Sequence, residues 1–168
     1  MKRNMRLFWL GAVSPRLATM PRPRGGEWLE SEIEALKQEG VQVVVSLLTG
    51  PEMKELDLWE EERLCIQKGI QYISFPIPDF STPASVREVR LLVETLTTSL
   101  AAGQRIVIHC RGGIGRASLI AACILVWEGK SVDESFAVIQ SARGCSVPDT
   151  REQVQWVERF QAFLKAFG

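Results

Sequence analysis

The chain has 168 residues, a length that fits one domain and can bury a sizeable hydrophobic core without disulfides. Hydrophobic residues make up 46% of the sequence and charged residues 24%, an ordinary globular composition that argues against disorder and against a coiled coil. The 20 basic and 20 acidic side chains cancel, so no overall positive field favours nucleic acid or an anionic membrane as a partner. Affinity for an anion has to come from a local site.

The cysteine content indicates a reducing environment rather than a disulfide scaffold. Four cysteines are few for this length, they include no C-x-x-C pair, and the only histidine, His109, cannot complete a usual zinc site. We therefore expect a cytoplasmic protein with no metal and no cofactor. Cys65, Cys123 and Cys145 are expected to be small buried residues. The sequence leaves open whether one of them pairs with the fourth cysteine on oxidation.

Two apolar segments resemble membrane or export signals without fulfilling their requirements. The run from Leu119 to Trp127 has nine residues, too few to span a membrane. At the N-terminus, basic residues and a short apolar run mimic a secretory signal, but Pro15 and Arg16 interrupt the pattern. We interpret the segment from Leu7 to Val13 as a first strand.

Strand and helix patterns alternate along the chain. The expected strands cover residues 7–13, 41–48, 70–75 and 105–109. The expected helices run from Leu29 to Gly40, over 53–68, from Pro83 (capped by Thr82) to Leu100, from the glycine-rich loop to Trp127, and from Val132 past Ile139; a last helix contains Val154, Val157 and Leu164. This alternation predicts a single α/β domain over residues 1–168, with a central, mostly parallel sheet of four to five strands covered by helices on both faces.

The segment CRGGIGR at residues 110–116 joins a buried strand to a helix. Backbone N–H groups of such a glycine-rich loop converge on an anion, and the helix N-terminus adds its positive dipole end. The guanidinium of Arg116 suits two phosphate oxygens at once. The same positive potential favours the thiolate of Cys110, which is then a nucleophile directed at phosphorus. The residues expected to bind the phosphate are Arg111, Gly112, Gly113, Ile114, Gly115 and Arg116.

A cysteine six positions before an arginine is a weak pattern by itself. Here a glycine follows the cysteine by three positions, His109 precedes it, and the context is strand, loop and helix. Neither the P-loop motif nor the dinucleotide fingerprint of nucleotide-binding loops is present. Residues 109–116 resemble the signature loop of the cysteine-based protein-tyrosine phosphatase superfamily. Chain length, helix order and the sequence PIPD at 76–79 resemble its compact dual-specificity branch, which includes kinase-associated phosphatase and small microbial tyrosine phosphatases.

The resemblance extends from about Leu17 to Phe163 and implies a two-step reaction without metal. Cys110 would form a phosphocysteine, water would hydrolyse it, and Arg116 would stabilise the transition state. Low-molecular-weight phosphatases and arsenate reductases share the Cys-to-Arg spacing, but their signature lies near the N-terminus, whereas here it begins at residue 109, after the expected strands.

A leaving alkoxide or phenolate needs a proton, so an acid is expected near the loop. Asp79 lies in the segment that matches the family's general-acid loop; its alternative role is to cap the helix expected at Pro83. His109 either supports the loop or is an ordinary buried strand-end residue. Gln153 resembles a glutamine near the hydrolytic water in some members, or else is a solvated residue in a first helical turn.

Two positions depart from the family pattern. The family commonly places Ser or Thr directly after the arginine, where it donates to the leaving thiolate. This chain has Ala117 there, and Ser118 is turned by about 100° around the helix. Arg111 beside the nucleophile resembles phosphoinositide phosphatases, although Ile114 replaces their second basic residue. The alternative for Arg111 is an ordinary solvent-exposed arginine.

Together these features predict a hydrolase that removes phosphate from phosphotyrosine in proteins or peptides, and the sequence leaves open whether it also acts on phosphoserine or phosphothreonine. The expected ligands of the loop are phosphate, sulfate or vanadate, and neither nucleic acid nor a membrane span is expected. Two alternatives remain open at this point: a phosphatase for phosphoinositides or other small polyanions, suggested by Arg111, and a phosphate-binding pseudophosphatase, suggested by Ala117.

Overall fold

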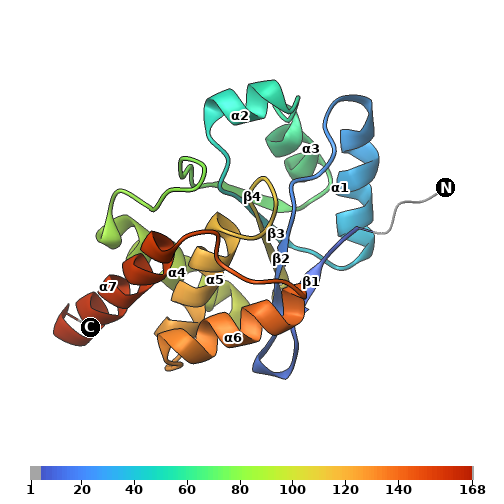
Figure 1. The fold of residues 1–168 in the computed structure, drawn as a ribbon. Coiled ribbons are helices and arrows are strands. Elements are labelled where there is room, and N and C mark those ends of the chain that lie inside the picture. The colour runs from blue at the N-terminus through green and yellow to red at the C-terminus, as the bar shows by residue number, and fades with distance from the viewer. Residues whose placement is uncertain (1–4, 168) are drawn as a thin grey trace.

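Across residues 5–167, which are those the computed structural model describes, five strands form one sheet in the order β1-β2-β5-β3-β4 (Figure 1). β1 and β2 are antiparallel, and the other neighbouring pairs are parallel. The α/β class and the mostly parallel sheet are as predicted. Lys2 and Arg3 of the signal-like segment lie outside the described residues. The strands are β1 (Phe8–Leu10), β2 (Ser14–Met20), β3 (Val43–Ser46), β4 (Gln71–Ser74) and β5 (Ile106–His109).

The N-terminal part of the sheet differs from the sequence prediction. The strand expected over residues 7–13 ends at Leu10, and a 3-10 turn (Gly11–Val13) reverses the chain into β2. The prediction missed β2 because Pro15 and Arg16 break its pattern. Both of these residues precede the part of β2, Leu17–Met20, that is buried and paired with β5.

Helices cover both faces of the sheet, as predicted (Figure 1). The three consecutive valines of β3 are explained by burial on both faces of the sheet: Val43 and Val45 face one core, and Val44 faces the other. The first core lies under α4 (Val86–Ala101), α5 (Arg116–Trp127), α6 (Val132–Arg143) and α7 (Arg151–Phe167). The second lies under α1 (Leu29–Gln38) and α3 (Glu61–Gln67).

Two helix predictions were wrong in their boundaries. The helix expected over 53–68 is two helices, α2 (Gly50–Glu55) and α3, separated by a turn in which Asp57 has a φ of 53°. The backbone N–H of Gly26 donates to the Asp57 carbonyl at 2.9 Å and fastens this turn to the body of the protein. The helix expected at Pro83 begins at Val86, because the Ser85 hydroxyl caps it by accepting from the Glu88 N–H at 3.2 Å.

The helix that follows the signature loop is the most deeply placed. Every residue of α5 from Arg116 to Val126 is buried, since the helix packs against the sheet and against α4, α6 and α7. Its first residue is therefore held rigidly at the carboxyl end of β5. Among residues 5–167, no helix has both the length and the apolar character that crossing a membrane requires.

Candidate active site

The candidate site lies where the parallel strands β3, β4 and β5 end on the same side of the sheet. β5 leads into the signature loop at residues 110–115, β3 leads into α2, and β4 leads into the loop that carries Asp79. Crevices at the carboxyl ends of parallel strands are the usual binding sites of open α/β sheets. The topology thus brings together three segments that are far apart in the sequence.

The carbonyl groups of the signature loop are held from the outside. Arg22 donates its N–H to the Arg111 carbonyl at 3.2 Å. Arg143, at the end of α6, donates to the carbonyls of Gly112 at 3.2 Å and Gly113 at 3.3 Å. In a trans peptide the C=O and the following N–H point in opposite directions. The amides that follow these carbonyls are therefore directed to the other side of the loop, as an anion-binding nest requires.

Two glycines of the loop are needed for close approach. A β-carbon at Gly113 would lie 2.6 Å from the Met20 carbonyl, and Gly113 also has a φ of 71°, which favours glycine. A β-carbon at Gly115 would lie 2.2 Å from Oδ2 of Asp149. The loop is therefore packed against the end of β2 on one side and against the segment before α7 on the other.

Cys110, the expected nucleophile, is 3% exposed at the base of this loop. His109 lies behind it and is fully buried, with Nδ1 3.3 Å from the Cys110 carbonyl oxygen and Nε2 2.6 Å from Oε1 of Glu61. Glu61 is also fully buried and comes from α3. This placement agrees with a supporting role for His109. Glu61 was not predicted from the sequence, because it lies in a run of acidic residues that indicates a solvent-exposed helix face.

The other cysteines are not arranged as nucleophiles. Burial, and after it the charge of Glu61, raises the pKa of Cys65 to about 12. Burial raises the pKa of Cys123 well above its ordinary value. Both therefore remain thiols at neutral pH. Cys145 is exposed, so the expectation that it is buried was wrong; it follows Gly144, the left-handed residue that ends α6, and so lies in the connection to α7.

Arg116 is 1% exposed and fully engaged. Its Nη1 and Nη2 donate to Oε1 and Oε2 of Glu52 at 2.7 and 2.9 Å, and Nη1 also donates to the Ile77 carbonyl at 2.8 Å. Burial works against the charged guanidinium, but Glu52, with Cys110 and Asp79, raises the pKa of Arg116 above its ordinary value. The guanidinium is thus a fixed positive charge that faces the loop.

Glu52 orients Arg116 and was not identified from the sequence. It lies on α2, where its carboxylate also accepts from the backbone N–H and the hydroxyl of Thr49 at 3.1 Å each. Burial opposes ionisation, but the bonds from Arg116 and Thr49 lower the pKa of Glu52. The pattern Thr-Gly-Pro-Glu at 49–52 is a capping box. It explains the local fold fully, so nothing in the sequence indicates that Glu52 also binds Arg116.

Asp79 reaches the site from the loop after β4. Its Oδ1 lies 2.9 Å from Nη2 of Arg116 and accepts the backbone N–H of Phe80 at 3.0 Å, while its side chain is 35% exposed. The next helix is capped by Ser85, so Asp79 does not take the capping role considered as its alternative. The structure therefore brings Asp79 and Arg116 together, as their predicted roles require.

Gln153 is fully buried, so the solvated alternative for it was wrong. Its Nε2 donates to the Ser81 carbonyl at 3.1 Å, and its Oε1 accepts the N–H groups of Asp149 at 3.0 Å and Thr150 at 3.1 Å. Gln153 thereby links the Asp79 loop to the turn before α7. Asp149, which sequence reasoning did not single out, is placed beside the signature loop by this link.

Arg111 is partly exposed, as its alternative role expects, and its guanidinium also pairs with acidic residues of α2. Its Nη2 donates to Oε1 of Glu55 at 2.9 Å, and its Nη1 lies 4.0 Å from Oε2 of Glu52. Its side chain is still 40% exposed. Because its guanidinium is already paired with glutamates of α2, Arg111 is not free to bind an additional phosphate group of a polyanionic substrate.

Ser118 is buried, and its Oγ has no hydrogen-bond partner among the described residues, the Cys110 sulfur included. Ala117 is also buried and offers no donor. Within residues 5–167, the two side chains that follow the arginine therefore supply no hydrogen bond to the thiolate. This is the arrangement expected if departure of the cysteine is unassisted.

This arrangement predicts that breakdown of the phosphocysteine limits turnover. Rapid mixing with an activated aryl phosphate should release a burst of about one equivalent of phenol per enzyme, followed by a slower steady rate. Ala117→Ser should shrink the burst and raise the steady rate, because a hydrogen bond to a charged sulfur contributes about 1.5–3 kcal/mol, roughly tenfold to hundredfold in rate. If both phases are unchanged in Ala117→Ser, another donor already serves the thiolate.

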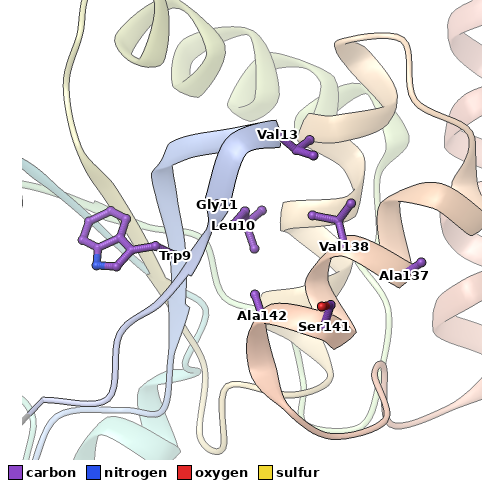
Figure 2. A pocket seen from close by; sticks show the side chains of 8 residues that line it. All are labelled: Trp9, Leu10, Gly11, Val13, Ala137, Val138, Ser141 and Ala142. Atoms are coloured by element: carbon purple, nitrogen blue, oxygen red, sulfur yellow. The ribbon is translucent and has the colours of Figure 1, made fainter.

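Within residues 5–167, a metal cluster and a separate pocket are the two further kinds of site to consider. Among the described residues, no group of three or more His, Cys, Asp or Glu side chains could hold a metal ion. A separate pocket of about 450 Å³ lies between the β1 hairpin and α6 (Figure 2). No residue of the signature loop lines it, so it is not part of the candidate active site. Its lining residues are Trp9, Leu10, Gly11, Val13, Ala137, Val138, Ser141 and Ala142.

Comparisons with known proteins agree with this site. A family model described as "Polymorphic toxin system, DSP-PTPase phosphatase" matches residues 18–130. Cyclin-dependent kinase inhibitor 3 of Rattus norvegicus is 30% identical over 141 residues, which cover 83% of this chain and 66% of that protein. The Homo sapiens protein of the same name is 31% identical over 142 residues, 82% of this chain and 66% of that protein. A crystal structure of kinase associated phosphatase, with its catalytic-site cysteine replaced by serine, matches with a TM-score of 0.90 at 26% identity and full coverage of both chains.

The chain thus spans just under two thirds of the length of these curated relatives. The matched family region contains the signature loop and the Asp79 loop, which carry the resemblance seen in the sequence. The predicted resemblance and the predicted fold are both confirmed. The chain belongs to the DSP-PTPase phosphatase family, within the compact dual-specificity branch of the cysteine-based protein-tyrosine phosphatases.

Proposed function

We propose that this protein is a metal-independent phosphomonoesterase that acts on phosphotyrosine, and in addition on phosphoserine or phosphothreonine, through a phosphocysteine intermediate. The observation that carries the proposal is the arrangement around one loop: Cys110 lies at its base, Arg116 at its end is fixed by Glu52, and Asp79 contacts Arg116. A nucleophile, a phosphate-binding cation and an acid are thus present at one place.

In the proposed reaction, the loop amides and Arg116 bind the phosphoryl oxygens. The Cys110 thiolate attacks phosphorus, and Asp79 is proposed to protonate the leaving oxygen. Water then hydrolyses the phosphocysteine, and Gln153, which contacts the Asp79 loop, is proposed to help place it. His109 supports the loop through the Cys110 carbonyl, and Glu61 fixes the imidazole from the other side.

The proposed substrates are phosphorylated proteins or peptides, consistent with the phosphatases among the related proteins. The phosphoinositide alternative is not favoured, because Arg111 is paired with Glu55. The pseudophosphatase alternative is not favoured either, since Cys110, Arg116 and Asp79 are all present and close together. We further propose that residues 1–168 act as one phosphatase domain. A cytoplasmic location is part of the proposal, because a nucleophilic thiolate needs a reducing compartment.

A substrate panel tests the proposal. Purified protein should hydrolyse an aryl phosphate and a phosphotyrosine peptide, and it should hydrolyse phosphoinositide headgroups at least tenfold more slowly. Activity should be unchanged by EDTA, because the proposed steps need no metal. Loss of activity in EDTA that zinc or magnesium restores would contradict the mechanism, and a preference for phosphoinositides would replace the proposed substrate class. Failure to hydrolyse any member of the panel would favour the pseudophosphatase.

A further inference from the structure

The carboxylates of Asp79 and Asp149 both lie beside the signature loop, and they differ in their contacts. Asp79 is paired with Arg116, with Oδ1 2.9 Å from Nη2. The carboxylate of Asp149 makes no hydrogen bond or ion pair with any residue in the range 5–167. Only its backbone N–H is engaged, by Gln153. Asp149 is therefore the carboxylate that is free to exchange a proton.

The position of Asp149 is fixed although its carboxylate is free. Oδ2 lies where it would be 2.2 Å from a β-carbon on Gly115, the residue that precedes Arg116 and forms the rim of the phosphate nest. The turn that carries Asp149 is tied by Gln153 to Ser81 of the Asp79 loop. The side chain is exposed beside the loop, so solvent can reach it.

The charges around Asp149 favour its protonated form. Partial burial, and after it the negative charge of Asp79, raises the pKa of Asp149 above its ordinary value, while Arg116 acts in the opposite direction. These two side chains are the charged groups that act on it. Asp149 therefore holds its proton to higher pH than an ordinary aspartate, as a proton donor requires.

We propose that Asp149 is a second general acid of the phosphatase reaction. This inference rests on the proposed function. As the Cys110 sulfur bonds to phosphorus, the bond from phosphorus to the leaving oxygen breaks, and its electron pair stays on that oxygen. The proton of the Asp149 carboxyl passes to this oxygen and leaves Asp149 as a carboxylate. In the second step water bonds to phosphorus, its proton returns to Asp149, and the sulfur departs as thiolate with the electron pair of the broken bond.

Leaving-group dependence tests this role. kcat/KM reports formation of the phosphocysteine, so it isolates the first proton transfer from slow hydrolysis. Asp149→Asn should lower kcat/KM at least tenfold for phenyl phosphate, whose leaving group needs a proton, and less than threefold for 2,4-dinitrophenyl phosphate, whose leaving group does not. Asp149→Glu should recover most of the loss. Asp79→Asn combined with Asp149→Asn should be slower on phenyl phosphate than either single variant. Asp133→Asn, an exposed aspartate in the first turn of α6, is the control and should leave both rates unchanged.

Two readouts separate this role from a structural one. The fall of kcat/KM for phenyl phosphate at high pH should move in Asp149→Asn, and NMR titration of the Asp149 carboxyl should give a lower pKa in Asp79→Asn than in the unaltered protein. Equal slowing of both substrates by Asp149→Asn, or no slowing, would overturn the inference and leave the proposed function standing. If the unaltered protein fails to turn over 2,4-dinitrophenyl phosphate through Cys110, the proposed function fails first and this inference with it.

Discussion

Cys110→Ser is expected to reduce turnover of every substrate by on the order of 10⁴-fold or more, because a serine hydroxyl in this site is not ionised at neutral pH. The same variant should still bind phosphate or vanadate. The loop amides, whose carbonyls are held by Arg22 and Arg143, and the guanidinium of Arg116 do not depend on the sulfur. Steady-state rates and anion binding by calorimetry measure the two properties separately.

The exposed Cys145 provides the matched control for this variant. Cys145→Ser should keep full activity, because its side chain lies in the connection between α6 and α7 and takes no part in the proposed reaction. Appreciable residual turnover in Cys110→Ser, or loss of activity in Cys145→Ser, would contradict a covalent mechanism at Cys110. Loss of anion binding together with turnover would show instead that the loop had collapsed.

Arg116→Ala is expected to lower both activity and stability. The guanidinium is the fixed cation of the site, and loss of one such electrostatic group costs about 10²–10³ in kcat. The change also leaves the Glu52 carboxylate, whose side chain is 10% exposed, without its partner. Breaking a buried pair on one side costs about 3–5 kcal/mol of unfolding free energy. Aryl phosphate kinetics and urea denaturation measure these two effects.

Combining Arg116→Met with Glu52→Gln distinguishes the two effects of this ion pair. The double variant should recover part of the lost stability, because the buried charge of Glu52 is removed together with that of Arg116, and it should stay inactive. The pair also predicts a pH dependence. Since the pKa of Glu52 is lowered in the folded state, its contribution to stability is present above its ordinary value of 4.5 and is lost as pH falls through the lowered value. Equal stability of Arg116→Ala and the double variant would show that an unpaired Glu52 carboxylate does not destabilise the folded protein.

Residues close together in the sequence were predicted well. The signature loop, its buried strand and its helix form one continuous segment, so the expected anion-binding loop and the candidate nucleophile could be located from the sequence alone. Asp79 could be placed only through the family resemblance. Glu52 and Glu61 could not be found, because their partners Arg116 and His109 are 64 and 48 positions away along the chain. Locally, Glu52 is explained by a capping box and Glu61 by an acidic helix surface, so neither local pattern indicates a buried partner.

Boundary errors have a similar physical origin. The helix expected over 53–68 is periodic enough to be continuous, but the turn at Asp57 is held by the distant Gly26. β2 was missed because Pro15 and Arg16 break its local pattern, and only its pairing with β5 places it inside the sheet. Asp149 was overlooked for the same reason, since only the return of the chain before α7 brings it beside Gly115. Tertiary contacts, absent from any local pattern, decided each of these cases.

The hydrogen bonds that hold the carbonyl groups of the signature loop from outside have a thermodynamic consequence. A nest whose amides face inward, with their carbonyls held by Arg22 and Arg143, keeps its shape before a phosphate arrives. Binding then requires little rearrangement of the backbone, and the reorganisation that a flexible loop would undergo during each catalytic cycle takes place once, when the chain folds. The folded state then carries a set of donors suited to an anion. An anion that fills the nest therefore stabilises the whole domain by mass action, by about 2.7 kcal/mol at a concentration of one hundred times its Kd.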